Sequence, residues 1–227
     1  MIVRKAIAGL AVMAVFGAAP LAAQDADMSF FSVSAGPSDG ANLGGLEGAD
    51  QHCQDLAHGA GFGGLTWRAY LSAISMGGQA AVNARDRIGE GPWYNYAGDR
   101  IARSVEDLHS DDANLTKQSI LSEKGQMANG RGNDPNMHDF LTGSNADGTV
   151  YMAEGHDACD NWRSNDEGSA RVGHHDRQGG GDDGTSWNSA HGSRGCSQEN
   201  LQATGGNGFF YCFAIDGSSD QQLIREW

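Results

Sequence analysis

The alternation of apolar and polar positions predicts a helix followed by a strand in the first part of the chain. Between Gly48 and Ala60, apolar residues recur at the spacing of one helix face, and Cys53 lies on that face. Residues 66–72 alternate between apolar and polar side chains, which is typical of a half-buried strand. We expect a second helix over residues 79–88, ended by the glycine and proline that follow it.

Short strands separated by turns are predicted in the second half of the chain. Residues 140–142 and 149–151 predict a strand pair around a polar turn, and residues 159–163 predict another short strand. Residues 165–195 contain almost no aliphatic side chain, so we expect long loops there. The apolar and aromatic run 209–215 is the expected last strand.

The two ends of the chain predict segments outside the folded domain. A charged start precedes an apolar stretch over residues 6–19, and small residues follow it, as in a secretory signal peptide. We therefore expect a signal peptide over residues 1–23, one domain over 28–216 and a flexible tail over 217–227. No later apolar stretch approaches the roughly 20 residues of a membrane span. The expected location is exported, either periplasmic or secreted.

The chain is strongly acidic, with a formal net charge of −14 over 227 residues. Nucleic acid and anionic membranes would be approached against like charge, which argues against both as partners. Neutral glycans, other polar ligands and cations are compatible with this charge. Glycine accounts for 34 residues, about twice its usual share. Such a content indicates many turns and a loop-rich fold.

Four cysteines, Cys53, Cys159, Cys196 and Cys212, are available for cross-links. An exported chain with an even number of cysteines predicts a disulfide framework. Four cysteines allow three pairings, and the count alone leaves all three open.

Five segments resemble endostatin, the C-terminal domain of certain collagens, in the same order along the chain. Residues 44–53 (Gly-Gly-Leu-Glu-Gly-Ala-Asp-Gln-His-Cys) and 61–72 are similar to its beginning. Residues 141–148 resemble its tight turn, and 159–163 its Cys-x-x-Trp strand. Residues 210–213 resemble its closing strand. Endostatin has the C-type lectin-like fold, which some small exported bacterial proteins labelled as lectins share.

This resemblance implies an α+β fold of the C-type lectin-like, endostatin-like kind, with a mixed or antiparallel sheet, two helices and long loops. It also implies nested disulfides, Cys53–Cys212 around Cys159–Cys196. Endostatin's basic functional surface has no counterpart in this acidic chain. The calcium-binding tripeptides of sugar-binding C-type lectins are absent too, because Asp160-Asn161-Trp162 has the residue types in another order.

The polar stretch 173–195 is the main candidate for a functional site. It combines imidazole, carboxylate, amide and guanidinium groups with an indole that could stack on a sugar ring. Our first hypothesis is therefore an exported binding protein that recognises a glycan or another polar ligand. The candidate ligand-binding residues are His174, His175, Asp176, Arg177, Trp187, Asn188, His191 and Arg194.

The same stretch supports a metal site as an alternative. The candidate metal ligands are His174, His175, Asp176 and His191. Their nitrogen and oxygen atoms suit a divalent metal such as zinc; calcium would need additional oxygen ligands. Adjacent histidines on a strand point to opposite faces, so only one would reach a shared site unless the backbone loops. A metal binder, a metal-dependent hydrolase and a structural or adhesive module without a small ligand all stay open.

Other motifs are weaker candidates. His138-Asp139 and the segment 109–112, with His109, Asp111 and Asp112, could also bind a cation. Residues 143–154 fit an EF-hand loop except at its first position, so we interpret them as a turn between strands. The glycine pattern at 59–64 follows a helix instead of a strand, which excludes a dinucleotide-binding loop.

Sequence motifs give little support for an enzyme. Neither Gly-x-Ser-x-Gly nor His-Glu-x-x-His occurs. A nucleophilic cysteine needs a free thiol, and all four are expected to be paired. We name no catalytic residue, although His175 or His191 with Asp176 could form an acid–base pair. Asn114 begins a glycosylation sequon, which matters only in a cell that makes that modification.

Overall fold

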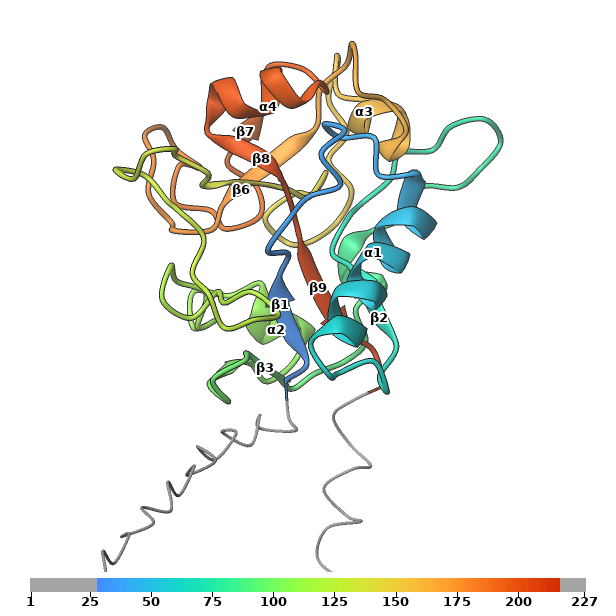
Figure 1. Cartoon of the computed structure of the whole chain (residues 1–227). Helices are drawn as coiled ribbons and strands as arrows, with labels where there is room; N and C mark the ends of the chain where they lie inside the picture. The colour runs from blue at the N-terminus through green and yellow to red at the C-terminus, as the bar shows by residue number, and fades with distance from the viewer. Residues whose placement is uncertain (1–27, 217–227) are drawn as a thin grey trace, which may run out of the picture.

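The computed structural model describes residues 28–216, so the predicted signal peptide and tail lie outside the described residues. The described chain is α+β, with four helices, mixed and antiparallel sheets and two disulfides (Figure 1). In chain order the elements are β1 (Phe30–Ser32), α1 (Gly45–Gly59), β2 (Trp67–Ala69), η1 (Ala84–Asp86), β3 (Trp93–Tyr94), β4 (Arg100–Ala102), α2 (Val105–Leu108), β5 (Asp139–Leu141), α3 (Ala158–Trp162), β6 (Arg171–His174), β7 (His191–Gly192), α4 (Gln198–Thr204), β8 (Gly206–Phe209) and β9 (Tyr211–Ala214).

Strand β9 is the centre of the core. It lies between β1 and β2 and pairs antiparallel with both. All four of its residues are buried, so the strand is continuously apolar and does not alternate. Cys212 on β9 is bonded to Cys53 on α1, and Cys159 to Cys196, which confirms the nested pairing.

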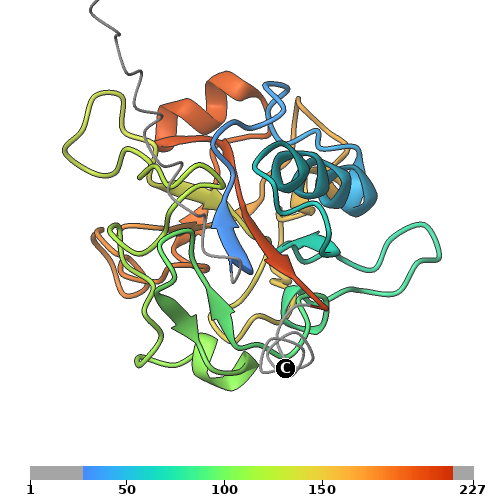
Figure 2. The same cartoon turned by 60° about the horizontal axis from the view of Figure 1, so that its bottom comes forward.

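Helix α1 packs against β2 beside the core (Figure 2). Its buried residues recur every fourth position, which places them on one face. The polar face contributes Asp50, whose carboxylate accepts two hydrogen bonds from Arg87 at 2.8 and 2.7 Å. The same carboxylate accepts the backbone N–H of Ala69 on β2. Asp50 therefore fixes the helix relative to both β2 and the chain around Arg87.

A second sheet, in the order β7-β6-β5-β8, positions the candidate site described below. Strand β5 pairs antiparallel with β6 and parallel with β8, and β7 pairs antiparallel with β6. Strand β8 continues almost directly into β9, so this sheet and the core sheet are joined through one short stretch of chain. The remaining two strands, β3 and β4, form a separate pair.

The predicted helix over residues 79–88 is wrong. Gly77 and Gly78 have positive φ and turn the chain back on itself. Ala73 and Val82 then exchange backbone hydrogen bonds of 2.9 and 2.8 Å at the base of a projecting arm (Figure 1). Only the single 3₁₀ turn η1 follows, because the hairpin uses the residues that a helix would need.

The predicted strand over residues 159–163 is also wrong, because α3 is a left-handed helical turn. All five of its residues have positive φ, which costs roughly 1 kcal/mol or more for each. Tertiary contacts hold the turn: Trp162 Nε1 donates to the Ser72 carbonyl at 2.8 Å, and the Cys159–Cys196 disulfide anchors its start. The expected strand 149–151 is reduced to a single bridge between Ser144 and Val150.

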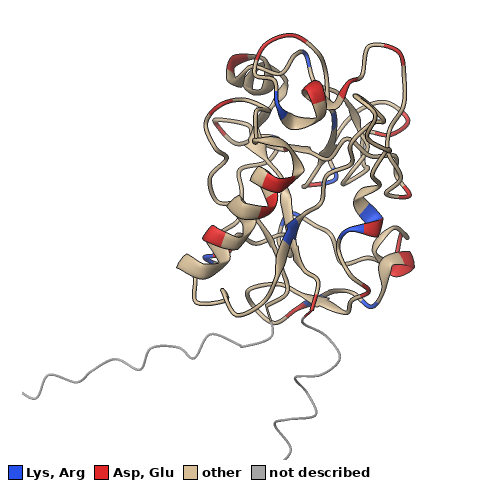
Figure 3. Cartoon of the chain, turned by 90° about the vertical axis from the view of Figure 1, so that its right-hand side faces the viewer, with Lys and Arg blue, Asp and Glu red and all other residues tan. Residues whose placement is uncertain are grey.

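Acidic residues are spread over α1 and the surrounding loops, whereas Lys and Arg are few (Figure 3). Among the described residues, no helix is both long and apolar enough to cross a membrane.

The ion pair between Asp50 and Arg87 gives the first prediction. Asp50→Asn should lower the free energy of unfolding by about 2 kcal/mol, because it leaves a mostly buried guanidinium without its carboxylate. Glu106→Gln is the matched control, since Glu106 is exposed and 3.8 Å from Arg85; its effect should stay within about 0.5 kcal/mol. Urea unfolding measures both, and equal effects would contradict the assignment.

Candidate metal centre

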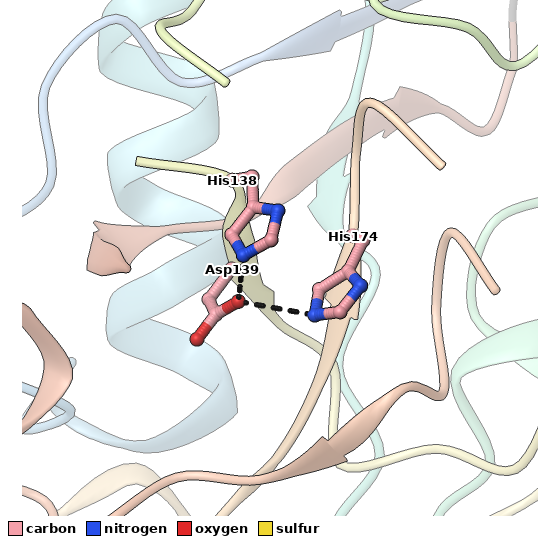
Figure 4. Close-up of side chains that lie close together, drawn as sticks. All are labelled: His138, Asp139 and His174. Carbon is pink, nitrogen blue, oxygen red and sulfur yellow. Dashed lines mark ion pairs between the residues drawn. The ribbon is translucent and has the colours of Figure 1, made fainter. Parts of the chain in front are cut away.

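Three imidazoles converge on one buried carboxylate in the second sheet. Asp139 Oδ1 lies 3.2 Å from His138 Nε2 and 3.3 Å from His174 Nε2 (Figure 4). His191 Nε2 lies 3.5 Å from the same oxygen. His138 and His174 stack face to face, with ring centres 4.1 Å apart. The two rings and the carboxylate are buried, whereas the His191 side chain is 40% exposed.

Strand pairing brings these residues together from distant parts of the sequence. Asp139, the first residue of β5, lies directly opposite His174, the last residue of β6. His191 on the edge strand β7 is paired with Val172, which shares a sheet face with His174. On the other side, Asp139 is paired with Gly206 of β8. A side chain at that position would approach Asp139 Cβ to 3.2 Å, so glycine leaves room for the carboxylate.

The other nitrogen of each imidazole is held by an acceptor. His174 Nδ1 donates to the Gly184 carbonyl at 2.7 Å, and His191 Nδ1 to the Gly192 carbonyl at 3.0 Å. His138 Nδ1 faces Asp176 Oδ1 at 3.3 Å. Since these oxygens can only accept, each Nδ1 carries a proton, and a ring that has no second proton presents an Nε2 lone pair toward Asp139.

The centre is therefore rich in electron pairs and poor in donors. No contact of hydrogen-bond geometry reaches either oxygen of Asp139 or His174 Nε2, although three imidazole nitrogens face Oδ1 at 3.2–3.5 Å. Buried polar atoms in this state cost free energy unless a cation or proton lies among them. One added proton satisfies one of these contacts, whereas a metal cation can contact His138, Asp139 and His174 together.

The electrostatics keep the carboxylate charged. Burial by itself would raise the pKa of Asp139, but the facing imidazoles of His174 and His191 outweigh it and lower this pKa to about 2. The Asp139 carboxylate in turn raises the pKa of His191, against the opposing effect of burial. Asp139 is thus an anion at neutral pH and can bind a cation.

Asp176 supports the centre from outside. Its burial favours the neutral acid, yet His138 and the backbone N–H groups of Arg131 and Gln178 hold its pKa well below the usual range. As an anion it fixes the orientation of His138. Carboxylates that hold a histidine ligand in this way are common around protein-bound zinc.

Of the residues predicted as metal ligands, the structure brings His174 and His191 together. His175 points away: its Nε2 contacts the Asn129 carbonyl at 3.0 Å, and its ring packs on Phe140. Burial lowers the pKa of His175. Asp176 contacts His138 and does not face Asp139. His175 and Asp176 therefore lie outside the group around Asp139, and the weaker candidate pair His138-Asp139 belongs to it.

The residues predicted for sugar binding are placed differently. Trp187 is only 4% exposed and packs against Tyr70 and Tyr211, so its ring does not offer a sugar-stacking surface. Asn188 is buried and donates to the Tyr70 hydroxyl at 2.9 Å. Arg177 and Arg194 lie outside the centre, where Arg177 Nε donates to the Thr185 carbonyl and Arg194 Nε to Asn200.

The other cation candidates do not form comparable groups. His109 donates from Nδ1 to the Val105 carbonyl and accepts from the Tyr70 hydroxyl at 2.7 Å. The EF-hand-like segment forms the expected tight turn, in which Gly148 N–H donates to the Asn145 carbonyl. Within residues 28–216, one group of three or more potential ligands has all its ligand atoms within 4.8 Å, and it consists of His138, Asp139 and His174.

Comparison with protein-family models and with curated proteins finds no match. The resemblance to endostatin therefore stays a prediction, and the chemistry of the site has to be argued from its geometry. The two disulfides suggest an extracellular or otherwise oxidising environment.

The buried position of Trp187 gives the second prediction. Trp187→Ala should lower the free energy of unfolding by about 3 kcal/mol, because it opens a cavity beside two tyrosines. Trp187→Phe keeps an aromatic ring there and should cost less. Urea unfolding of both variants tests this, and a fully stable Trp187→Ala protein would contradict the core position of the indole.

Proposed function

We propose that this protein is an exported zinc-binding protein whose centre consists of His138, Asp139, His174 and His191. The observation that carries this proposal is the convergence of three imidazole Nε2 atoms on one buried, donor-free carboxylate oxygen. His138, Asp139 and His174 are the core of the ligand set. His191, at the exposed edge, is the fourth ligand.

The kind of ligand atom favours zinc over the other common divalent metals. Zinc takes four ligands, often histidine nitrogen and carboxylate oxygen. Calcium requires six to eight oxygen ligands, and this centre offers mainly nitrogen. Sulfur ligands, which select Cu(I) and iron–sulfur clusters, do not contribute, since all four cysteines are disulfide-bonded.

A metal here would cross-link a part of the fold that has little hydrophobic packing of its own. The four ligands come from β5, β6 and β7 and from the residue preceding β5. The loops around them belong to the stretch 165–195, where aliphatic residues are scarce. Three of the ligands are buried and the fourth faces solvent, so the ion would enter from the His191 side.

Glycan recognition, the first hypothesis from the sequence, gains no support from the site. Trp187 and Asn188, which that hypothesis needed as a stacking surface and a polar contact, both contribute to the core. A metal-binding protein is therefore the function that the geometry supports best.

Zinc binding is the third prediction. The purified protein, treated with chelator and dialysed, should bind one Zn²⁺ per chain in calorimetry, and saturating zinc should raise its melting temperature. Asp139→Asn should weaken binding at least 100-fold, because it removes the only charged ligand. His58→Gln is the control, since His58 is exposed at the end of α1, far along the chain from the centre.

Two results would overturn the proposal. In the first, zinc leaves the melting temperature unchanged, so the four groups hold only a proton. In the second, Asp139→Asn and His58→Gln bind zinc equally well, so the ion lies elsewhere.

The support from Asp176 is the fourth prediction. Asp176→Asn keeps the size of the side chain but loses the charge that orients His138. Zinc affinity should fall about tenfold, the usual effect of losing a group that holds a metal ligand. Asp182→Asn, on an exposed loop, should leave affinity unchanged. Calorimetric titrations of both variants measure the difference, and identical affinities would contradict this role of Asp176.

A further inference from the structure

A second candidate site lies away from the metal centre, in a cavity of about 410 Å³. Its walls are the first turn of α1, the arm at residues 73–82, and the chain at the end of α3 (Figure 1). Small-molecule sites are usually 300–1,000 Å³ in volume, so the cavity is within that range.

One side of the cavity is apolar and open. Leu46 contributes from α1, and Ile74, Ala80 and Val82 contribute from the arm. None of these four side chains is fully buried, and Ala80 is exposed. Burying them against an apolar ligand would be favourable, because it removes apolar surface from water.

The arm is fixed in place next to the body of the protein. Asn161 Nδ2 donates to the Ile74 carbonyl at 2.9 Å, and Asn161 Oδ1 accepts the Ile74 N–H at 2.8 Å. The side-chain amide thus pairs with the arm as a neighbouring strand would. Because α3 is held by the core, this wall exists before any ligand binds.

The other side of the cavity carries the positively charged side chain of Arg163, which forms an exposed ion pair with Glu47. The Arg163 guanidinium lies so close to Gly45 that a Cβ there would come within 2.4 Å of Cζ. Its Nη2 atom is 3.2 Å from Glu47 Oε2, and the two side chains are 53% and 83% exposed. Exposed ion pairs contribute little to stability, so another carboxylate can replace Glu47 at little cost.

We propose that this cavity binds a small amphipathic carboxylate, with the head group on Arg163 and the apolar part against the arm and Leu46. The net negative charge of the chain does not prevent this, because charges more than about 8 Å away are largely screened at physiological ionic strength. This inference is independent of the proposed zinc centre, which shares no residue with the cavity.

Glu47 and Arg163 should affect binding in opposite directions. Arg163→Gln removes the charge that holds the head group, so affinity should fall about tenfold. Glu47→Gln removes the competing carboxylate, so affinity should rise two- to fivefold. A change in stability alone would not make one variant bind more weakly and the other more tightly. A general effect of surface charge would not make the loss for Arg163→Gln larger than the gain for Glu47→Gln.

The experiment uses octanoate as the probe. Its binding is measured by calorimetry and by the NMR chemical-shift changes of the Ile74 and Val82 amides. Octanol and octylamine have the same chain with a neutral or positive head and should bind at least tenfold more weakly. Arg103→Gln is the matched control, because Arg103 is also an exposed arginine paired with a carboxylate, Asp107. Its affinity for octanoate should equal that of the unmodified protein.

Several outcomes would overturn this proposal. If octanoate does not bind, or if it shifts amide signals of residues outside the cavity, the proposed site is wrong. If octanol binds as tightly as octanoate, Arg163 does not hold the head group. The same conclusion follows if Arg163→Gln and Arg103→Gln have equal affinities for octanoate. Urea unfolding of the same variants checks that they are folded, and it does not depend on whether the metal centre binds zinc.

Discussion

The pairing of β9 with two neighbours and with α1 is the constraint on which the rest of the structure depends. Strand β9 is buried, is hydrogen-bonded on both edges and is joined to α1 by Cys53–Cys212. Strand β8 ends next to the start of β9, so its position follows from that of β9. Since β8 pairs with β5, the core also sets where Asp139 lies.

The candidate metal centre is where this ordered framework leaves polar groups unpaired. The backbone pairing of β5 and β6 places Asp139 and His174 side by side, and it does so even though their side chains do not satisfy each other's hydrogen-bonding groups. The loops then use each Nδ1 atom for a carbonyl or carboxylate, which leaves lone pairs directed inward. Native proteins rarely bury such a set without a compensating group. A cation is a compensating group that His138, Asp139 and His174 could hold together.

Much of the core could be predicted from the sequence because its signals are local. The apolar spacing around Cys53 identifies α1, and the aromatic run at Cys212 identifies β9. The resemblance to endostatin gave the disulfide pairing, which the structure confirms. The helix predicted over residues 79–88 is wrong because the turn at Gly77 and Gly78 leads Val82 back to pair with Ala73, a contact between residues that the local pattern does not reveal.

Features that depend on distant contacts could not be predicted in the same way. The left-handed turn of α3 has unfavourable backbone angles, and what compensates is a buried tryptophan and a disulfide. Because adjacent residues on a strand face opposite ways, only one histidine of the pair at 174 and 175 faces Asp139. Which one it is depends on the pairing of β6 with β5. His138 and Asp139, earlier in the chain, join the same group of side chains through this pairing.

The inner disulfide connects the two proposed sites. Cys159 lies in α3, whose Asn161 holds the arm at the edge of the cavity. Cys196 follows β7, which carries His191. A covalent link between these segments means that neither wall can move far without displacing the other. It does not require the sites to communicate, because coupling needs an element with two arrangements that both ligands bias. A rigid link instead favours independent binding at the two sites.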